Sequence, residues 1–160
     1  MLVLKLLLIL AFGLLAYQDV KDRAVSWVLF PAIGLLLIAL YAHQTTTEQY
    51  LLATLVNVAL VSLIIGILWL YTRVIAHKKF LNTSFGLGDL LFFYAFALGF
   101  PTLTFIVLFA CSLLFSLLVF LLAGNRYKMQ TIPLAGLMGM FLIGVLLVSL
   151  IPNSISIYLL

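Results

Sequence analysis

The chain has 160 residues, of which 67% are hydrophobic and 8% are charged, and its mean hydropathy is +1.38. This composition excludes a soluble globular domain and indicates an integral membrane protein, because runs of about 18 or more apolar residues are typical of transmembrane helices. The net charge is +4, but the basic residues are scattered and form no patch with aromatic residues. We therefore interpret the charge as a signal of membrane orientation and not of nucleic-acid binding.

Six apolar spans follow one another along the chain, which predicts an all-α, polytopic membrane protein with a single domain, residues 1–160. Helices are expected because they satisfy their own backbone groups in lipid, and the spans lack the alternation of barrel strands. The first span could also be a signal peptide, but it is predicted to be a retained helix because no A-x-A-like signal-peptide cleavage site follows it. The predicted spans are Leu2–Tyr17, Val25–Tyr41, Leu51–Ile75, Asp89–Phe100, Leu103–Ala123 and Ile132–Ile151.

The basic residues predict how the six spans are oriented. Seven of the eight fall in the breaks at 18–24, 76–88 and 124–131 or at their edges, which share one side of the membrane if the spans alternate. That side is cytoplasmic by the positive-inside rule, so the N-terminus and the C-terminus are predicted to lie outside. Only Lys5 falls toward the outer side. The seven residues are Lys21, Arg23, Arg73, Lys78, Lys79, Arg126 and Lys128.

Three of the four acidic residues fall on the predicted cytoplasmic side. Asp19 and Asp22 follow the first span, and Asp89 opens the fourth, whereas Glu48 lies in the outer polar loop. Acidic residues at a membrane boundary are costly and tend to be functional. The sequence therefore directs attention to the cytoplasmic ends of the first and fourth spans.

Asp89 stands in the stretch SFGLGDLLFF, residues 84–93, after Gly86 and Gly88. Glycine permits backbone conformations that are closed to other residues, and it allows another segment to approach closely. One interpretation of Asp89 is structural, as the cap of the fourth helix, because a helix N-terminus favours negative charge. The presence of Asp19 at the same membrane face favours a functional interpretation.

Two carboxylates brought together from different helices can share one proton, because like charges at short range do not both ionise easily. One carboxylate can then activate a water molecule while the other protonates a peptide carbonyl oxygen. This is the chemistry of an aspartic protease, and it needs neither a metal nor a cofactor. Asp19 and Asp89 are the predicted pair. Asp22 is the alternative to Asp19, although Lys21 and Arg23 beside it explain it as part of a solvated ion pair.

The residues around these aspartates resemble a known family. GLGD at 86–89 matches the GxGD signature of intramembrane aspartic proteases, and within that group the chain is similar to type IV prepilin peptidases and archaeal preflagellin peptidases. In that family a first aspartate follows the first helix in a pattern like D-x-x-x-R, which DVKDRAVSW at 19–27 matches at Asp19 and Arg23. A later pattern like IPFAP has the form IPLAG at 132–136. The order and spacing of these stretches fit across nearly the whole chain.

The resemblance implies an aspartic endopeptidase that cleaves the leader of prepilin-like proteins. It implies a multi-pass protein of the inner (plasma) membrane whose active site faces the cytoplasm. Asp19 and Asp89 would be catalytic, and Gly86, Gly88 and Arg23 would support them. No metal or cofactor is implied, and the expected partners are the prepilin-like substrate and the lipid bilayer, with no nucleic acid.

Four positions depart from the family patterns. Ser26 and Trp27 replace a usual Pro-Asn pair, Leu91 replaces a usual Lys, and Gly136 replaces a usual Pro. These departures favour an alternative function, a non-enzymatic membrane component of a pilus or secretion system. A small proton-coupled transporter is a further alternative, because paired carboxylates can relay protons. Against it, the chain shows no internal repeat of the kind that many transporters have.

Polar residues inside and between the spans have structural interpretations. Asn57 in the third span and Ser112 and Ser116 in the fifth are predicted to make hydrogen bonds between helices. Lys78 and Lys79 in the 76–88 break are predicted to anchor the third span at the lipid headgroups.

Overall fold

The structure is a computed structural model that describes residues 1–74, 86–127 and 133–151, and these residues form six α-helices and no β-strand. The predicted all-α class is therefore confirmed for the described part of the chain. Lys78, Lys79 and Lys128 lie outside it. The helices are α1 (Leu2–Asp22), α2 (Leu29–Ala42), α3 (Thr47–Val74), α4 (Leu87–Ala97), α5 (Thr102–Tyr127) and α6 (Leu134–Val148).

The described helices are of two lengths. Three are long and apolar enough to cross a membrane, namely α1, α3 and the part of α5 from Thr102 to Leu122. Helices α2, α4 and α6 have 14, 11 and 15 residues. They are thus about 16–22 Å long, at 1.5 Å per residue. The hydrocarbon core of a bilayer is about 30 Å thick.

Two helix ends differ from the prediction in a way that matters for the aspartates. Helix α1 continues to Asp22, so Asp19 and Asp22 lie in its last turn and not after it. It ends at Arg23, whose left-handed backbone (φ 54°, ψ 20°) turns the chain away from the helix axis. The next residues form a turn in which the amide of Leu29 donates to the carbonyl of Ser26 at 3.0 Å. Helix α2 therefore begins four residues later than predicted, at Leu29.

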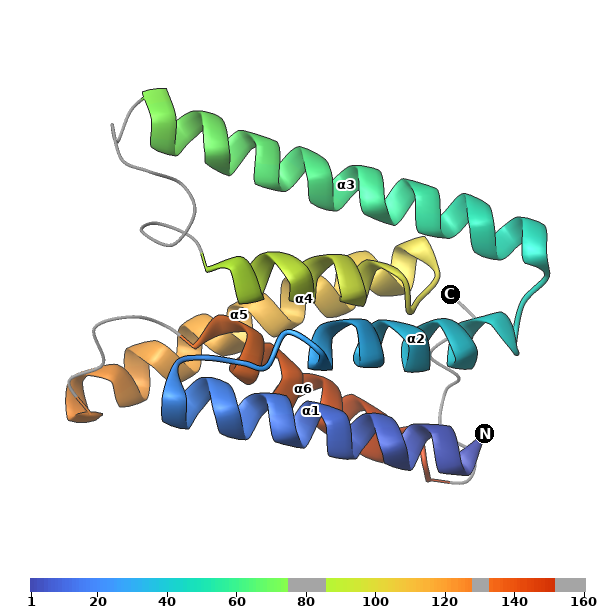
Figure 1. The fold of residues 1–160 in the computed structure, drawn as a ribbon, viewed down its shortest axis with the longest axis horizontal. Coiled ribbons are helices and arrows are strands. Elements are labelled where there is room, and N and C mark those ends of the chain that lie inside the picture. Colours follow the sequence, from blue (N-terminus) through green and yellow to red (C-terminus); the bar gives the residue numbers. More distant parts are fainter. Residues whose placement is uncertain (75–85, 128–132, 152–160) are drawn as a thin grey trace.

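Consecutive helices run in opposite directions, as Figure 1 shows. Helices α1 and α3 lie on opposite sides, with α2 and α4 between them in that view. Helix α1 packs on α6 and α2, α4 packs on α2 and α3, and α5 packs on α6. The end of α1 and the starts of α4 and α6 therefore meet at one end of the bundle.

Aromatic rings hold α4 against its neighbours. The ring of Phe96 lies 5.5 Å, centroid to centroid, from the rings of both Phe100 and Phe105. The ring of Phe92 contacts that of Phe12 on α1 at 6.2 Å. All five side chains are almost completely buried. Edge-to-face contacts of this kind add to the stabilisation from burial, so the short α4 has a fixed position between α1 and α5.

Asn57 joins α3 to the end of α4. Its Nδ2 donates to the carbonyl oxygens of Ala97 at 3.1 Å and Phe100 at 2.9 Å, which satisfies acceptors that the helix end leaves open. The prediction of a hydrogen bond between helices is confirmed for Asn57. It is wrong for Ser112 and Ser116, whose hydroxyls donate to carbonyls of their own helix. A serine can bond to the preceding turn of its own helix, and this contact competes with a bond across the interface.

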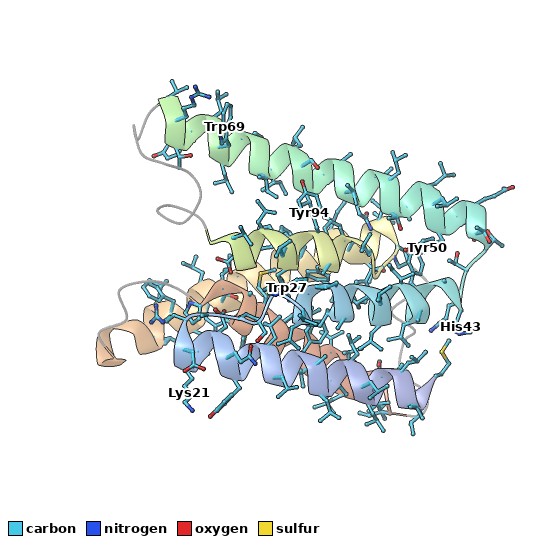
Figure 2. All side chains as sticks on the ribbon, viewed as in Figure 1. Lys21, Trp27, His43, Tyr50, Trp69 and Tyr94 are labelled. Carbon is cyan, nitrogen blue, oxygen red and sulfur yellow. The ribbon has the colours of Figure 1, made fainter. Side chains whose placement is uncertain are left out.

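Polar and aromatic side chains mark both ends of the bundle. Figure 2 shows Lys21 and Trp69 toward one end and His43 and Tyr50 toward the other. The guanidinium of Arg73 lies 5.1 Å from the ring centroid of Trp69. Tryptophan, tyrosine and basic residues at two levels are typical of the two interfaces of a membrane protein.

Lys5 binds the end of α6. Its Nζ donates to the backbone carbonyl oxygen of Ser149 at 2.8 Å and to the Oγ of Ser149 at 3.0 Å. Ser149 is the C-cap of α6, where the helix dipole favours a positive charge. The one basic residue that departs from the predicted charge asymmetry therefore has a structural partner.

We expect Lys5→Met to destabilise the protein by about 2 kcal/mol, because a part-buried, charge-assisted hydrogen bond is lost. Thermal unfolding in detergent micelles measures the effect. Lys21→Met is the control: its Nζ bonds the hydroxyl of Tyr17 in an exposed position, and its loss should cost about 1 kcal/mol or less. Equal stability of the Lys5 variant and the control would contradict the role assigned to Lys5.

Candidate active site

Asp19 reaches α6 from the last turn of α1. Its side chain is partly buried, and its Oδ2 accepts a hydrogen bond from the backbone amide of Gly136 at 2.6 Å. Helices α1 and α6 are antiparallel, so Asp19 lies at the start of α6 while Lys5 lies at its end. Asp19 and Lys5 thus match the two ends of the α6 dipole.

Asp89 reaches the same point from α4. It is the third residue of α4, and its Oδ1 accepts a hydrogen bond from the backbone amide of Ala135 at 3.0 Å. The alternative interpretation of Asp89 as the cap of its own helix is not supported, because the N-cap of α4 is Gly86 and no side chain bonds there. Asp89 instead caps α6.

The first turn of α6 brings the two carboxylates together. The first amides of a helix have no partner within the helix and attract negative groups. Here two successive amides, of Ala135 and Gly136, each donate to one aspartate. Because these amides belong to adjacent residues, both carboxylates lie at the same turn of α6. The two aspartates singled out in the sequence therefore meet in the structure.

Gly86 and Gly88 matter for space and not for unusual backbone angles. No glycine in the described residues has a positive φ, and Gly86 has ordinary extended angles (φ −72°, ψ 138°). A methyl group on Gly86 would lie 3.0 Å from Oδ2 of Asp89. One on Gly88 would lie 3.3 Å from Cζ of Phe30 on α2. The expected close approach of other groups is confirmed, and the expected special conformation is wrong.

Arg23 and Asp22 differ in their relation to the pair. Arg23 directly follows the last turn of α1, in which Asp19 lies. Asp22 has an exposed side chain in the same turn of α1. Of the two alternatives in the sequence, Asp19 and not Asp22 is thus the one that contacts α6.

The arrangement has the parts needed for acid–base chemistry. Each hydrogen bond to α6 uses one carboxylate oxygen, which leaves Oδ1 of Asp19 and Oδ2 of Asp89 outside these two bonds. The space beside Oδ2 of Asp89 depends on the missing side chain of Gly86. In the part of the chain that the structure describes, no group of three or more His, Cys, Asp or Glu residues is placed to hold a metal ion.

Sequence reasoning missed the contribution of α6. Ala135 and Gly136 act through backbone amides, which no side-chain pattern reveals. One signal was present, since a proline such as Pro133 is typical of a helix start. Pro133 is indeed the N-cap of α6.

The chain was compared with known proteins. Searches against protein-family models, curated proteins and solved structures gave no match for this chain.

Proposed function

We propose that this protein is a membrane aspartic endopeptidase in which Asp19 and Asp89 are the catalytic pair. The observation that carries the proposal is the meeting of two carboxylates, from α1 and α4, on successive amides of α6. Fixed partners orient both side chains, and such orientation is what acid–base catalysis requires. The resemblance of GLGD and DVKDR to motifs of the prepilin peptidase family supports the same assignment.

The mechanism follows from the shared proton. A water molecule held between the carboxylates loses a proton to the ionised aspartate and attacks the carbonyl carbon of the scissile peptide. The protonated aspartate donates its proton to the carbonyl oxygen, so the tetrahedral intermediate is neutral. The first aspartate then gives its new proton to the leaving nitrogen, and the second takes a proton back from a hydroxyl of the intermediate as the C–N bond breaks and the C=O bond re-forms. This exchange returns the pair to its singly protonated state.

The proposed topology has six membrane segments, with both termini outside and the site at the cytoplasmic face of the plasma membrane. The alternating helix directions are compatible with it (Figure 1). The hydrogen bond from Lys5 to Ser149 gives a structural reason for the one basic residue that does not follow the charge asymmetry between the two sides. The short helices α2, α4 and α6 would be shielded by the longer ones or sit where the bilayer is thinner.

The proposed substrates are prepilin-like proteins, including type IV pilins, pseudopilins and preflagellins. Such a substrate has a short basic leader followed by an apolar helix in the membrane. Cleavage at the junction of the two would take place at the membrane boundary, which is where the end of α1 and the start of α4 lie in this topology.

A structural function is the second candidate, and one observation favours it. Each aspartate caps α6, and this contact stabilises the helix whether or not chemistry takes place. The two functions differ in their response to asparagine. An asparagine oxygen also accepts an amide hydrogen bond, so Asp→Asn preserves a cap but removes the proton on which catalysis depends.

Cleavage by the purified full-length protein in detergent micelles tests the proposal. Prepilin-like proteins encoded in the same genome are incubated with it, and mass spectrometry identifies the products. We expect a single cut after the glycine that ends the leader. A substrate with that glycine replaced by a bulky residue is the control and should stay intact. Absence of cleavage for all candidates, together with pH-dependent flux in liposomes, would favour the transporter instead.

A further inference from the structure

Gly136 lies where the first turn of α6 meets the last turn of α1. Its amide donates to Oδ2 of Asp19 at 2.6 Å. A methyl group on its Cα would lie 3.0 Å from both Cβ and Oδ2 of Asp19, and 3.4 Å from Cα of Ala16. At 3.0 Å the neighbour must move by a few tenths of an ångström. The position therefore combines an amide that holds Asp19 with the absence of a side chain that would displace it.

Two other glycines of α6 provide a comparison. A methyl group on Gly139, one turn further along and also facing α1, would make ordinary contacts of 3.5 Å with Leu15 and 3.6 Å with Phe12. A methyl group on Gly144 would have nothing within 4 Å. The tight contact is thus confined to the glycine beside Asp19 and does not extend along the α1–α6 interface.

We propose that Gly136 is a positioning residue, which acts through Asp19 by holding its carboxylate opposite Asp89. This inference rests on the proposed function. It also changes the interpretation of one departure from the family patterns, the glycine at 136 in place of a usual proline. A proline at 136 would have no amide hydrogen to donate, whereas the glycine in this chain supplies the donor that Asp19 uses. The substitution therefore belongs to the site and is not a sign that activity has been lost.

Gly136→Ala is expected to lower kcat about tenfold, because a displacement of a catalytic group by less than 1 Å already costs rate. KM should stay within about twofold of wild type, since the contact orients Asp19 and does not hold the substrate. Gly139→Ala is the matched control: the same substitution on the same helix face. A kcat unchanged in Gly136→Ala, or lowered equally in both variants, overturns the inference.

A second measurement tests the contact without any cleavage. Melting temperatures are compared for wild type, Gly136→Ala, Asp19→Gly and the double variant in detergent. Asp19→Gly removes both contacting atoms, so the destabilisation by Gly136→Ala should largely disappear in that background. The cost of glycine in a helix cancels in this cycle. Additive shifts in melting temperature mean that residues 19 and 136 do not touch, and they overturn the inference.

Failure of the proposed function and failure of the inference about Gly136 give different results. If wild type cuts no substrate, the proposed function fails and the role of Gly136 in catalysis falls with it, even where the melting temperatures are non-additive. If wild type cuts and Gly136→Ala keeps its kcat, the endopeptidase stands and only the positioning role is lost.

Discussion

Asp19→Asn and Asp89→Asn are each expected to lower the cleavage rate by about a thousandfold or more, because acid–base catalysis needs a proton that asparagine neither holds nor accepts. Both variants should remain folded, since an asparagine oxygen still accepts the amide hydrogen bond from α6. Single-turnover cleavage of a prepilin-like substrate measures the rate, and thermal unfolding measures the fold.

Asp22→Asn is the matched control for these two variants. It makes the same chemical change in the same turn of α1 as Asp19, on a side chain that is exposed. We expect less than a threefold change in its rate. Wild-type rates in all three variants would mean that the aspartates only cap α6, and a loss in Asp22→Asn alone would mean that the pair has been misassigned.

Gly86→Val is expected to lower kcat about a hundredfold. The Cβ of a side chain at 86 would lie 3.0 Å from Oδ2 of Asp89, and the hydrogen bond from the amide of Ala135 to Oδ1 limits how the carboxylate can move away. It would also fill the space in which we place the attacking water. Displacement of a catalytic group by about 1 Å can cost this much. Steady-state kinetics of cleavage measure the change.

The backbone at 86 accepts valine without strain, because its φ and ψ are those of an ordinary extended residue. The expected loss is therefore due to the side chain and not to the fold. Gly66→Val is the control, since a methyl group on Gly66 would have nothing within 4 Å. A Gly86→Val protein with wild-type kcat would show that the GxGD glycines do not serve Asp89.

The order and number of the described helices could be predicted because each is a separate apolar run, set off by a polar break or, between α4 and α5, by the turn at Pro101. Their ends were less predictable. The residues after position 17 are polar, which suggested the end of the first span, but they are compatible with a helix and α1 continues to Asp22. The start of α2 is set by a turn at Ser26, and neither an apolar nor a polar pattern reveals such a turn.

The candidate site was predictable in part for a physical reason. Aspartates at a membrane boundary are costly, so Asp19 and Asp89 could be selected from four acidic residues. The backbone groups that hold these aspartates could not be identified in the same way. The amides of Ala135 and Gly136 exist at every non-proline residue and become donors only because a helix starts there. The role of Lys5 could not be predicted for a related reason, because its main partner is the backbone carbonyl oxygen of Ser149 at the end of α6.

The central claim is that Asp19 and Asp89 act as one catalytic unit, and the Asp19→Asn, Asp89→Asn double variant tests it most directly. Groups that act as a unit have non-additive effects on rate. We therefore predict that single-turnover cleavage by the double variant falls to the same residual rate as either single variant. A rate in the double variant that is lower by the product of the two single losses would mean that the carboxylates act independently, and would contradict the shared-proton pair.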